Sequence, residues 1–277
     1  MCGIFGKYSV DGVTTESLRR MADVLVHRGP DDVGFHAEGP IGLGNRRLSI
    51  IDLKRGRQPI CNEDGTIWIV FNGEIYNYRA LREQLKSQGH SFKTSTDTEV
   101  IVHLYEQEGD RCVEQLEGMF AFVIWDAPRT RMFCARDRLG QKPLYYHHRP
   151  GLFVFASEIK GILATEDVEP ALDPLALHDY LSLRFVPPPR TMFRAIHKLP
   201  AAHTLTLEKD EIKVQRYWSL RYDPKLKIDE RDAQAALEGI LAEAVESHQV
   251  GDVPVGALLS GGLDSGLVVA LMGMQNN

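Results

Sequence analysis

Short apolar runs recur through roughly the first 220 residues of the chain, and most are too short to be helices. The clearest run, Ile67-Trp68-Ile69-Val70-Phe71, is rich in β-branched and aromatic residues and predicts a buried strand that stops at residues 72–74. Similar runs predict strands at residues 3–6, 41–44, 48–52, 119–125, 131–135 and 152–156. A late hairpin is expected to turn through Lys209-Asp210.

Helical periodicity predicts three helices in the same part of the chain. The first repeats apolar residues over positions 18–25, and the second covers about residues 78–87. The third begins at Thr96 or Asp97, because Thr96 and Glu99 have the spacing of a capping box. Many short strands with a few helices between them predict an α+β fold in which two sheets pack face to face, with helices outside.

The composition changes after Trp218. Pro224 and the charged run at 225–232 predict a linker over residues 219–232, between a domain of residues 2–218 and a segment of residues 233–277. That segment opens with a helix that carries one apolar stripe.

An apolar strand at residues 253–259 is then expected to run into Ser260-Gly261-Gly262-Leu263-Asp264-Ser265, with a helix beginning at about residue 266. Glycines allow a tight turn, and the amides at the start of a helix point at negative oxygens. The order of strand, glycine-rich turn and helix therefore predicts an anion site.

Charge and cysteine usage narrow the function classes. The net charge of -6, without any basic run, argues against a nucleic-acid surface and favours small-molecule partners. No apolar run is long enough to cross a membrane, and the first residues lack the features of a signal peptide. Four scattered cysteines and ten histidines show no metal-binding spacing, so we expect no metal ligands among them and a reduced, cytoplasmic protein.

Cys2 is the leading candidate nucleophile. If an aminopeptidase removes Met1, the thiol and the free α-amine share one residue. The amine titrates near ~8 and the thiol near ~8.5, so the amine can move the proton of the thiol. The alternative is that the chain starts with Met-Cys by chance.

Several motifs, in this order along the chain, resemble those of glutamine-dependent asparagine synthetases. They are Met1-Cys2-Gly3-Ile4-Phe5-Gly6, His27-Arg28-Gly29-Pro30-Asp31, Arg47-Leu48-Ser49-Ile50, Phe71-Asn72-Gly73-Glu74-Ile75-Tyr76-Asn77, Gly118-Met119-Phe120-Ala121-Phe122 and the SGGLDS turn at 260–265. The resemblance implies a four-layer αββα glutaminase domain of the N-terminal-nucleophile hydrolase type. It also implies that the start of an α/β ATP-pyrophosphatase domain follows. Because such synthetases continue well beyond this turn, the chain looks truncated at Asn277.

The resemblance assigns roles in glutamine hydrolysis. Cys2 would attack the side-chain amide of glutamine, and the Asn72 side chain and Gly73 N–H would hold the oxyanion. Arg47 would bind the carboxylate of glutamine, Glu74 and Asp97 its ammonium, and the backbone of Ile50 would be a further contact. Without the family, other roles remain open: a hairpin turn for Asn72-Gly73, a surface ion pair for Arg47, a helix-start acid for Glu74 and a helix cap for Asp97.

For the second domain the resemblance implies ATP as cofactor and aspartate as acceptor. Pyrophosphate would bind through Leu259, Ser260, Gly261, Gly262 and Ser265, while Asp264 would reach a Mg²⁺ ion. Amidation of another carboxylate remains an alternative, as does a non-catalytic fragment that binds glutamine. The sequence leaves the oligomeric state open, with a homodimer as one option.

Overall fold

The computed structural model describes residues 1–275 of the chain. The chain divides into two compact units, with the boundary between Ser219 and Leu220. The first unit contains two six-stranded sheets in which every strand pairing is antiparallel. The strands of the first sheet are β1 (Gly3–Ser9), β2 (Asp32–Glu38), β3 (Ile41–Arg47), β8 (Tyr145–Arg149), β9 (Leu152–Ala156) and β10 (His197–Lys198). Those of the second are β4 (Ile60–Cys61), β5 (Ile67–Ile75), β6 (Gly118–Asp126), β7 (Arg131–Arg136), β11 (His203–Glu208) and β12 (Glu211–Arg216).

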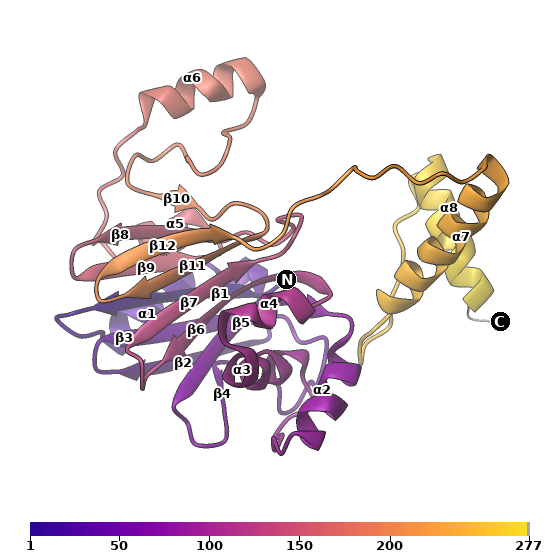
Figure 1. Cartoon of the computed structure of the whole chain (residues 1–277). Helices are drawn as coiled ribbons and strands as arrows, with labels where there is room; N and C mark the ends of the chain where they lie inside the picture. Colours follow the sequence, from indigo (N-terminus) through magenta and orange to yellow (C-terminus); the bar gives the residue numbers. More distant parts are fainter. Residues whose placement is uncertain (276–277) are drawn as a thin grey trace. The chain divides into compact units, whose positions relative to one another are not determined.

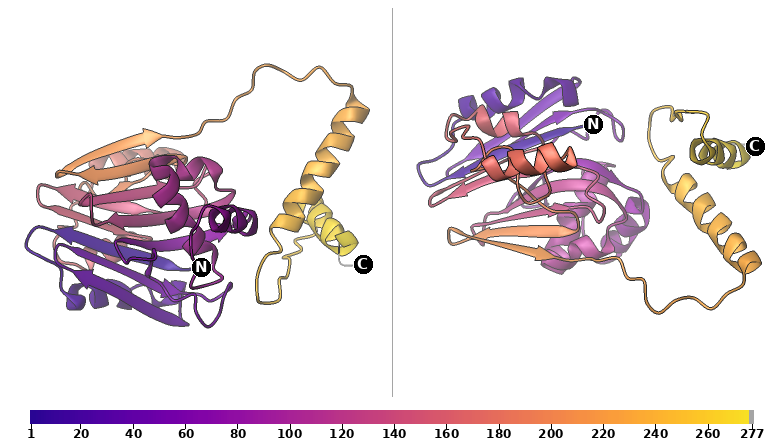
Figure 2. Two further views of the ribbon diagram at one scale, coloured as in Figure 1. Left: turned by 60° about the horizontal axis from the view of Figure 1, so that its bottom comes forward. Right: turned by 90° about the horizontal axis from the view of Figure 1, so that it is seen from above.

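The two sheets pack face to face, and helices cover their outer faces (Figures 1 and 2). The strand orders are β10-β8-β9-β1-β3-β2 and β12-β11-β7-β6-β5-β4. The helices of this unit are α1 (Thr15–Asp23), α2 (Tyr78–Ser87), α3 (Asp97–Glu108), α4 (Cys112–Gln115), α5 (Ile159–Leu163) and α6 (Pro174–Leu183). Helices α1 and α5 pack on the first sheet, whereas α3 packs on β5 of the second. The four-layer αββα arrangement is therefore present.

Two apolar cores separate the layers, and strand alternation assigns residues to each of them. Ile4 belongs to the core between the sheets, together with Val70 and Val123 of the second sheet. Its neighbour Phe5 belongs to the core between the first sheet and α1. Since side chains alternate along a strand, residues two positions from Ile4 or Val70 also face the space between the sheets.

Several predicted elements are confirmed. Helix α2 covers residues 78–87 as predicted, and α3 begins at Asp97 with the Thr96 hydroxyl accepting a hydrogen bond from Glu99 N. The expected hairpin is β11-β12, and it turns through Lys209 and Asp210, both at positive φ.

Other predictions are wrong. Residues 48–52 form a loop instead of a strand, and β5 continues through residues 72–74 to Ile75 because it pairs with β6 along its whole length. Residues 253–259 also lack the expected strand. A strand is stable only with hydrogen-bonded neighbours, and the described part of the second unit contains no strand.

The second unit contains two packed helices, α7 (Glu230–Ser247) and α8 (Leu263–Gln275). Gln275 connects them, because its Nε2 donates to the carbonyl of Ala242 at 2.7 Å. Across residues 1–275, no helix combines the length and apolarity needed to span a membrane.

Candidate active site

The candidate residues for glutamine chemistry converge at one end of the space between the sheets. Cys2 precedes Ile4 by two positions, and Asn72 and Glu74 follow Val70 by two and four, so all three face that space. Gly3 of β1 pairs with Arg46 of β3 in antiparallel register. The next residue of β3, Arg47, therefore lies across from Cys2. A polar pocket lies here, and its walls include Cys2, Arg47, Ile50, Gly73, Glu74 and Asp97.

The Cys2 thiol is partly buried, with Sγ 3.7 Å from the carbonyl of Leu48. Burial raises the pKa of the Cys2 thiol, so it needs a base to become a nucleophile. Burial also lowers the pKa of the adjacent chain-terminal amine, which here belongs to Met1. The Met1 residue itself is 57% exposed.

Asn72 and Gly73 lie within β5 opposite Ala121 and Phe120 of β6, which rules out the hairpin turn. Asn72 is 1% exposed and its Nδ2 has no hydrogen-bond partner. A buried donor without a partner is costly, so its persistence needs a reason such as a bound acceptor. Gly73 leaves no room for a side chain, because a Cβ would lie 2.2 Å from the carbonyl oxygen of Met119.

Arg47 has a second task besides presenting a positive charge to the pocket. Its guanidinium donates to the carbonyls of Ile51 and Asp52, both at 2.8 Å, and to that of Leu53 at 3.4 Å. These bonds hold the loop that replaces the expected strand and that carries Ile50. Arg47 is 6% exposed, so it is not a surface ion-pair residue.

Glu74 and Asp97 form a pair of interacting carboxylates. Burial and the charge of Asp97 raise the pKa of Glu74, and burial also raises the pKa of Asp97 although its Oδ2 accepts from Ile75 N at 3.0 Å. Neither residue has the alternative role considered from the sequence, since Glu74 lies in β5 and Thr96 caps α3. Two carboxylates that resist ionisation are well suited to a cationic ligand, which would stabilise their charged forms.

Two residues of the His27-Arg28-Gly29-Pro30-Asp31 motif, for which no individual role was predicted, support the pocket. Arg28 Nε donates to the carbonyl of Cys2 at 3.0 Å and its Nη1 pairs with Glu158 at 2.9 Å. Asp31 Oδ2 accepts from Ser49 N at 2.8 Å and so anchors the loop beside Arg47. Their place in a motif that resembles the family was the sequence signal for these two residues.

Lys142 was also missed. It is 5% exposed, and its Nζ lies 3.4 Å from the sulfur of Met1. Burial lowers the pKa of Lys142, whereas the charge of Glu74 acts in the opposite direction. A single lysine in a loop has no sequence pattern that would have revealed this position.

In the second unit, residues 260–262 form an exposed turn and residues 263–265 begin α8, which starts three residues earlier than predicted. The hydroxyls of Ser260 and Ser265 lie 2.9 Å apart, and Gly261 has a φ of +82°, a conformation that favours glycine. Asp264 and Ser265 also line a cleft between α7, α8 and residues 255–258. Leu259 and Gly262 are exposed beside them.

Comparison with known proteins identifies both parts of the chain. Residues 1–218 match the glutamine amidotransferase domain family, and residues 236–277 match the asparagine synthase family. The chain is 39% identical over 277 residues to glutamine-hydrolyzing asparagine synthetase 3 of Bacillus subtilis. It is 40% identical over 305 residues to the putative glutamine-hydrolyzing asparagine synthetase 2 of Methanocaldococcus jannaschii. These alignments cover 98% of this chain but only 45% and 57% of the relatives.

A solved structure supports the fold. The glutamine phosphoribosylpyrophosphate amidotransferase of B. subtilis aligns with a TM-score of 0.60 and 19% identity, over 98% of this chain and 64% of that chain. The sandwich of the first unit is thus the N-terminal-nucleophile hydrolase fold. With a matching family model over residues 1–218, this chain belongs to the glutamine amidotransferase family.

Proposed function

We propose that the first unit hydrolyses glutamine at Cys2 and releases ammonia. The observation that carries the proposal is the polar pocket, whose walls include a thiol, a guanidinium, the buried carboxylate of Asp97 and the partly buried carboxylate of Glu74. Glutamine has an amide, a carboxylate and an ammonium group. Arg47 would bind its carboxylate, Glu74 and Asp97 its ammonium, and the backbone of Ile50 would contact the rest of the molecule.

The reaction follows from this placement. The Cys2 sulfur forms a bond to the amide carbon, and the thiol proton passes through the α-amine of Cys2 to the nitrogen that leaves as ammonia. Water then hydrolyses the thioester to glutamate and restores the thiol. During the attack, negative charge collects on the carbonyl oxygen. The unpartnered Asn72 Nδ2 and the Gly73 N–H would bind that oxygen.

This mechanism requires removal of Met1, because otherwise the nitrogen of Cys2 is part of a peptide bond. The exposure of Met1 leaves it accessible for cleavage. A chain that keeps Met1 would bind glutamine without hydrolysing it, which is the non-catalytic alternative. Intact-mass measurement distinguishes the two states.

The second unit would bind ATP. The turn has the donors that a pyrophosphate group needs, namely the hydroxyls of Ser260 and Ser265 and the amides at the start of α8. Leu259, Gly261 and Gly262 would complete this contact, and Asp264 would reach Mg²⁺. ATP supplies the activation of a carboxylate that ammonia then attacks.

We propose aspartate as the acceptor of the whole protein, because the curated relatives are named asparagine synthetases. The chain spans about half the length of these relatives, so another carboxylate acceptor remains the alternative. We also propose that residues 2–218 form the glutaminase domain, 219–232 a linker and 233–277 part of the synthetase domain. The four free cysteines fit a reducing compartment such as the cytoplasm.

The test is the release of glutamate and ammonia from glutamine. Cys2→Ala should abolish release, whereas Cys61→Ala, which changes a partly buried cysteine in β4, should retain it. Both variants should keep the thermal stability of the parent within a few degrees. Release that survives in Cys2→Ala would disprove the assignment of the nucleophile.

A further inference from the structure

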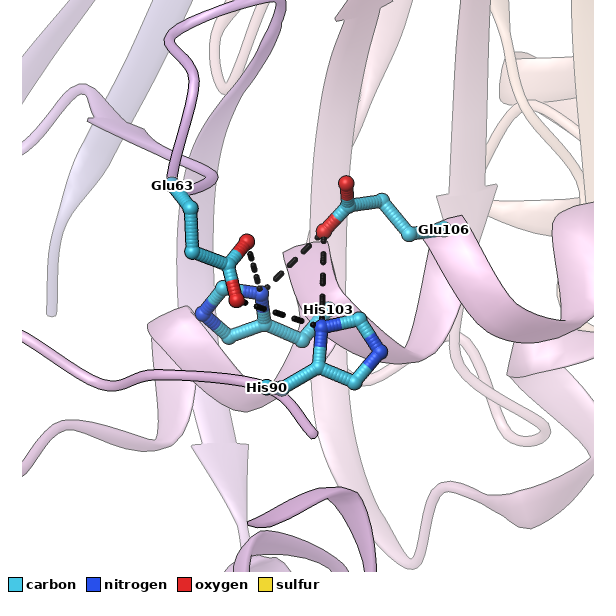
Figure 3. Close-up of side chains that lie close together, drawn as sticks. All are labelled: Glu63, His90, His103 and Glu106. Carbon is cyan, nitrogen blue, oxygen red and sulfur yellow. Dashed lines mark hydrogen bonds and ion pairs between the residues drawn. The ribbon is translucent and has the colours of Figure 1, made fainter. Parts of the chain in front are cut away.

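Four potential metal ligands meet at the outer side of the second sheet, and none of them lines the glutamine pocket. They are Glu63 after β4, His90 after α2, and His103 and Glu106 of α3 (Figure 3). One ligand atom from each lies within 4.8 Å of all the others. The histidine spacing along the sequence does not show this site, because three separate segments contribute to it.

Four contacts between these side chains, which involve both oxygens of Glu63, have lengths near the ligand–ligand distance of a tetrahedral metal shell. His103 Nδ1 lies 3.2 Å from Glu63 Oε2 and 3.1 Å from Glu106 Oε2, and His90 Nδ1 lies 3.3 Å from Glu63 Oε1 and 3.8 Å from Glu106 Oε2. Ligands about 2.0–2.1 Å from a Zn²⁺ ion at tetrahedral angles are separated by about 3.3 Å. Small side-chain shifts would therefore be enough to accommodate an ion.

Neighbouring groups already orient these ligands. His103 Nε2 is buried without a hydrogen-bond partner and lies 3.7 Å from the buried carboxylate of Glu99, so a small shift would give it the carboxylate partner that metal-binding histidines commonly have. Asn62 Nδ2 donates to Glu106 Oε1 at 2.8 Å, and Ser91 N donates to Glu63 Oε1 at 2.8 Å. Such outer contacts distinguish a built site from a chance group of acids.

We propose that Glu63, His90, His103 and Glu106 bind one divalent transition-metal ion of the Zn²⁺ type. The His₂Glu₂ set supplies four protein ligands, which fill a tetrahedral shell and leave no position for a substrate. The bound ion is therefore structural. Side-chain exposure of 35% at Glu63 and 14% at His90 gives the ion a route in, while His103 is 1% exposed.

The bound ion would cross-link three segments of the chain. It connects the turn after β4 and the segment after α2 to the middle of α3. Helix α3 begins with Asp97, which lines the glutamine pocket. A bound ion would thus hold the helix that presents this carboxylate, without taking part in the chemistry.

A proton competes with the metal. Burial lowers the pKa of His103, but its contacts with Glu106, Glu99 and Glu63 outweigh this and raise it to about 9. The carboxylates of Glu63, Glu99 and Glu106 face the ring of His103, and the ring of His90 lies 5.0 Å from it. Because a histidine must lose this proton to bind a metal, affinity should fall as the pH is lowered.

The test uses the full chain, stripped with a chelator and titrated with Zn²⁺ or Co²⁺ by calorimetry and visible absorption. We expect one ion per chain, a tetrahedral Co²⁺ spectrum, proton release and a higher melting temperature. His90→Ala should abolish saturable binding, and Glu99→Gln should weaken it about 10- to 100-fold. His178→Ala is the matched control, because it removes an exposed histidine that lies 3.8 Å from Asp179 on α6.

Cys2→Ala separates this site from the pocket, since a thiolate also binds zinc. Binding that persists in Cys2→Ala and disappears in His90→Ala supports the proposal, whether or not glutamine is hydrolysed. Binding lost in Cys2→Ala but retained in His90→Ala would overturn it. Equal binding by the parent and His90→Ala would also overturn it, and the cluster would then be an ion-pair network around a protonated His103.

Discussion

Asn72→Ala tests the oxyanion assignment most directly. The Asn72 Nδ2 is buried and without a partner, and at 1% exposure the residue leaves no room for bulk water to replace the lost donor. Removal of one oxyanion donor costs about 3 kcal/mol of transition-state stabilisation, which at about 1.4 kcal/mol per tenfold is roughly a hundredfold in rate. The loss should appear in kcat, with little change in KM, because the donor acts on charge that develops only during the attack.

Folding stability should respond differently. A buried donor without a partner costs about 1–3 kcal/mol, so its removal offsets much of the packing that is lost with the side chain. We therefore expect the free energy of unfolding of Asn72→Ala to stay within about 1 kcal/mol of the parent. Steady-state glutaminase kinetics and urea unfolding, measured on the same sample, separate the two effects.

Asn45→Ala is the matched control, because Asn45 is also a buried asparagine, on β3 of the facing sheet. Its Nδ2 donates to Gln58 Oε1 at 3.2 Å and to the carbonyl of Phe71 at 3.1 Å. Truncation there should lower stability, with far less than a hundredfold effect on kcat. A near-parental kcat for Asn72→Ala, or a change confined to KM, would refute the oxyanion role.

Three further predictions concern charge. Arg47→Ala should raise KM for glutamine about 10- to 100-fold by removing charge-assisted hydrogen bonds, and a loss confined to kcat in steady-state assays would contradict this. Because the pKa of Glu74 is raised, the empty pocket retains a proton above the usual carboxyl range, so KM should fall as pH rises; in Glu74→Gln this dependence should weaken. Since the pKa of His103 is raised to about 9 from about 6.5, its contribution without metal is complete below pH 6.5 and is lost as pH rises through 9. Urea unfolding in chelator should show a decline of at most about 3 kcal/mol over that window, and one equivalent of Zn²⁺ should reverse the trend.

The regular parts of the fold could be predicted because local rules decide them. Helix α2 follows from its periodicity, and the start of α3 follows from the hydrogen bond between Thr96 and Glu99. The core strands follow from short runs of residues with apolar side chains. In these segments the tertiary structure agrees with local preference.

The errors arise where a side-chain contact or strand pairing overrides the local preference of the sequence. Residues 48–52 contain isoleucines that suit a strand, but Arg47 binds the carbonyls of this segment and holds it as a loop. Asn72-Gly73 is a strong hairpin signal, yet full-length pairing with β6 keeps both residues extended.

The candidate site also contains both residues that local sequence motifs reveal and residues that they do not. Cys2, Arg47 and Glu74 were named from motifs, and all three line the pocket. Lys142 and the cluster around His103 could not be named, because their neighbours come from distant segments. Only the spacing of His103 and Glu106 on one helix is local, and it is common on helices without any metal.

The position of Cys2 immediately before β1 has a practical consequence for anyone who produces this protein. An affinity tag fused ahead of Cys2 would leave a well-folded but silent enzyme, since the tag would convert the required amine into an amide. A tag with a protease site that releases cysteine as the new first residue would restore turnover. Removal of the residues before Cys2 would thus activate each molecule once and irreversibly.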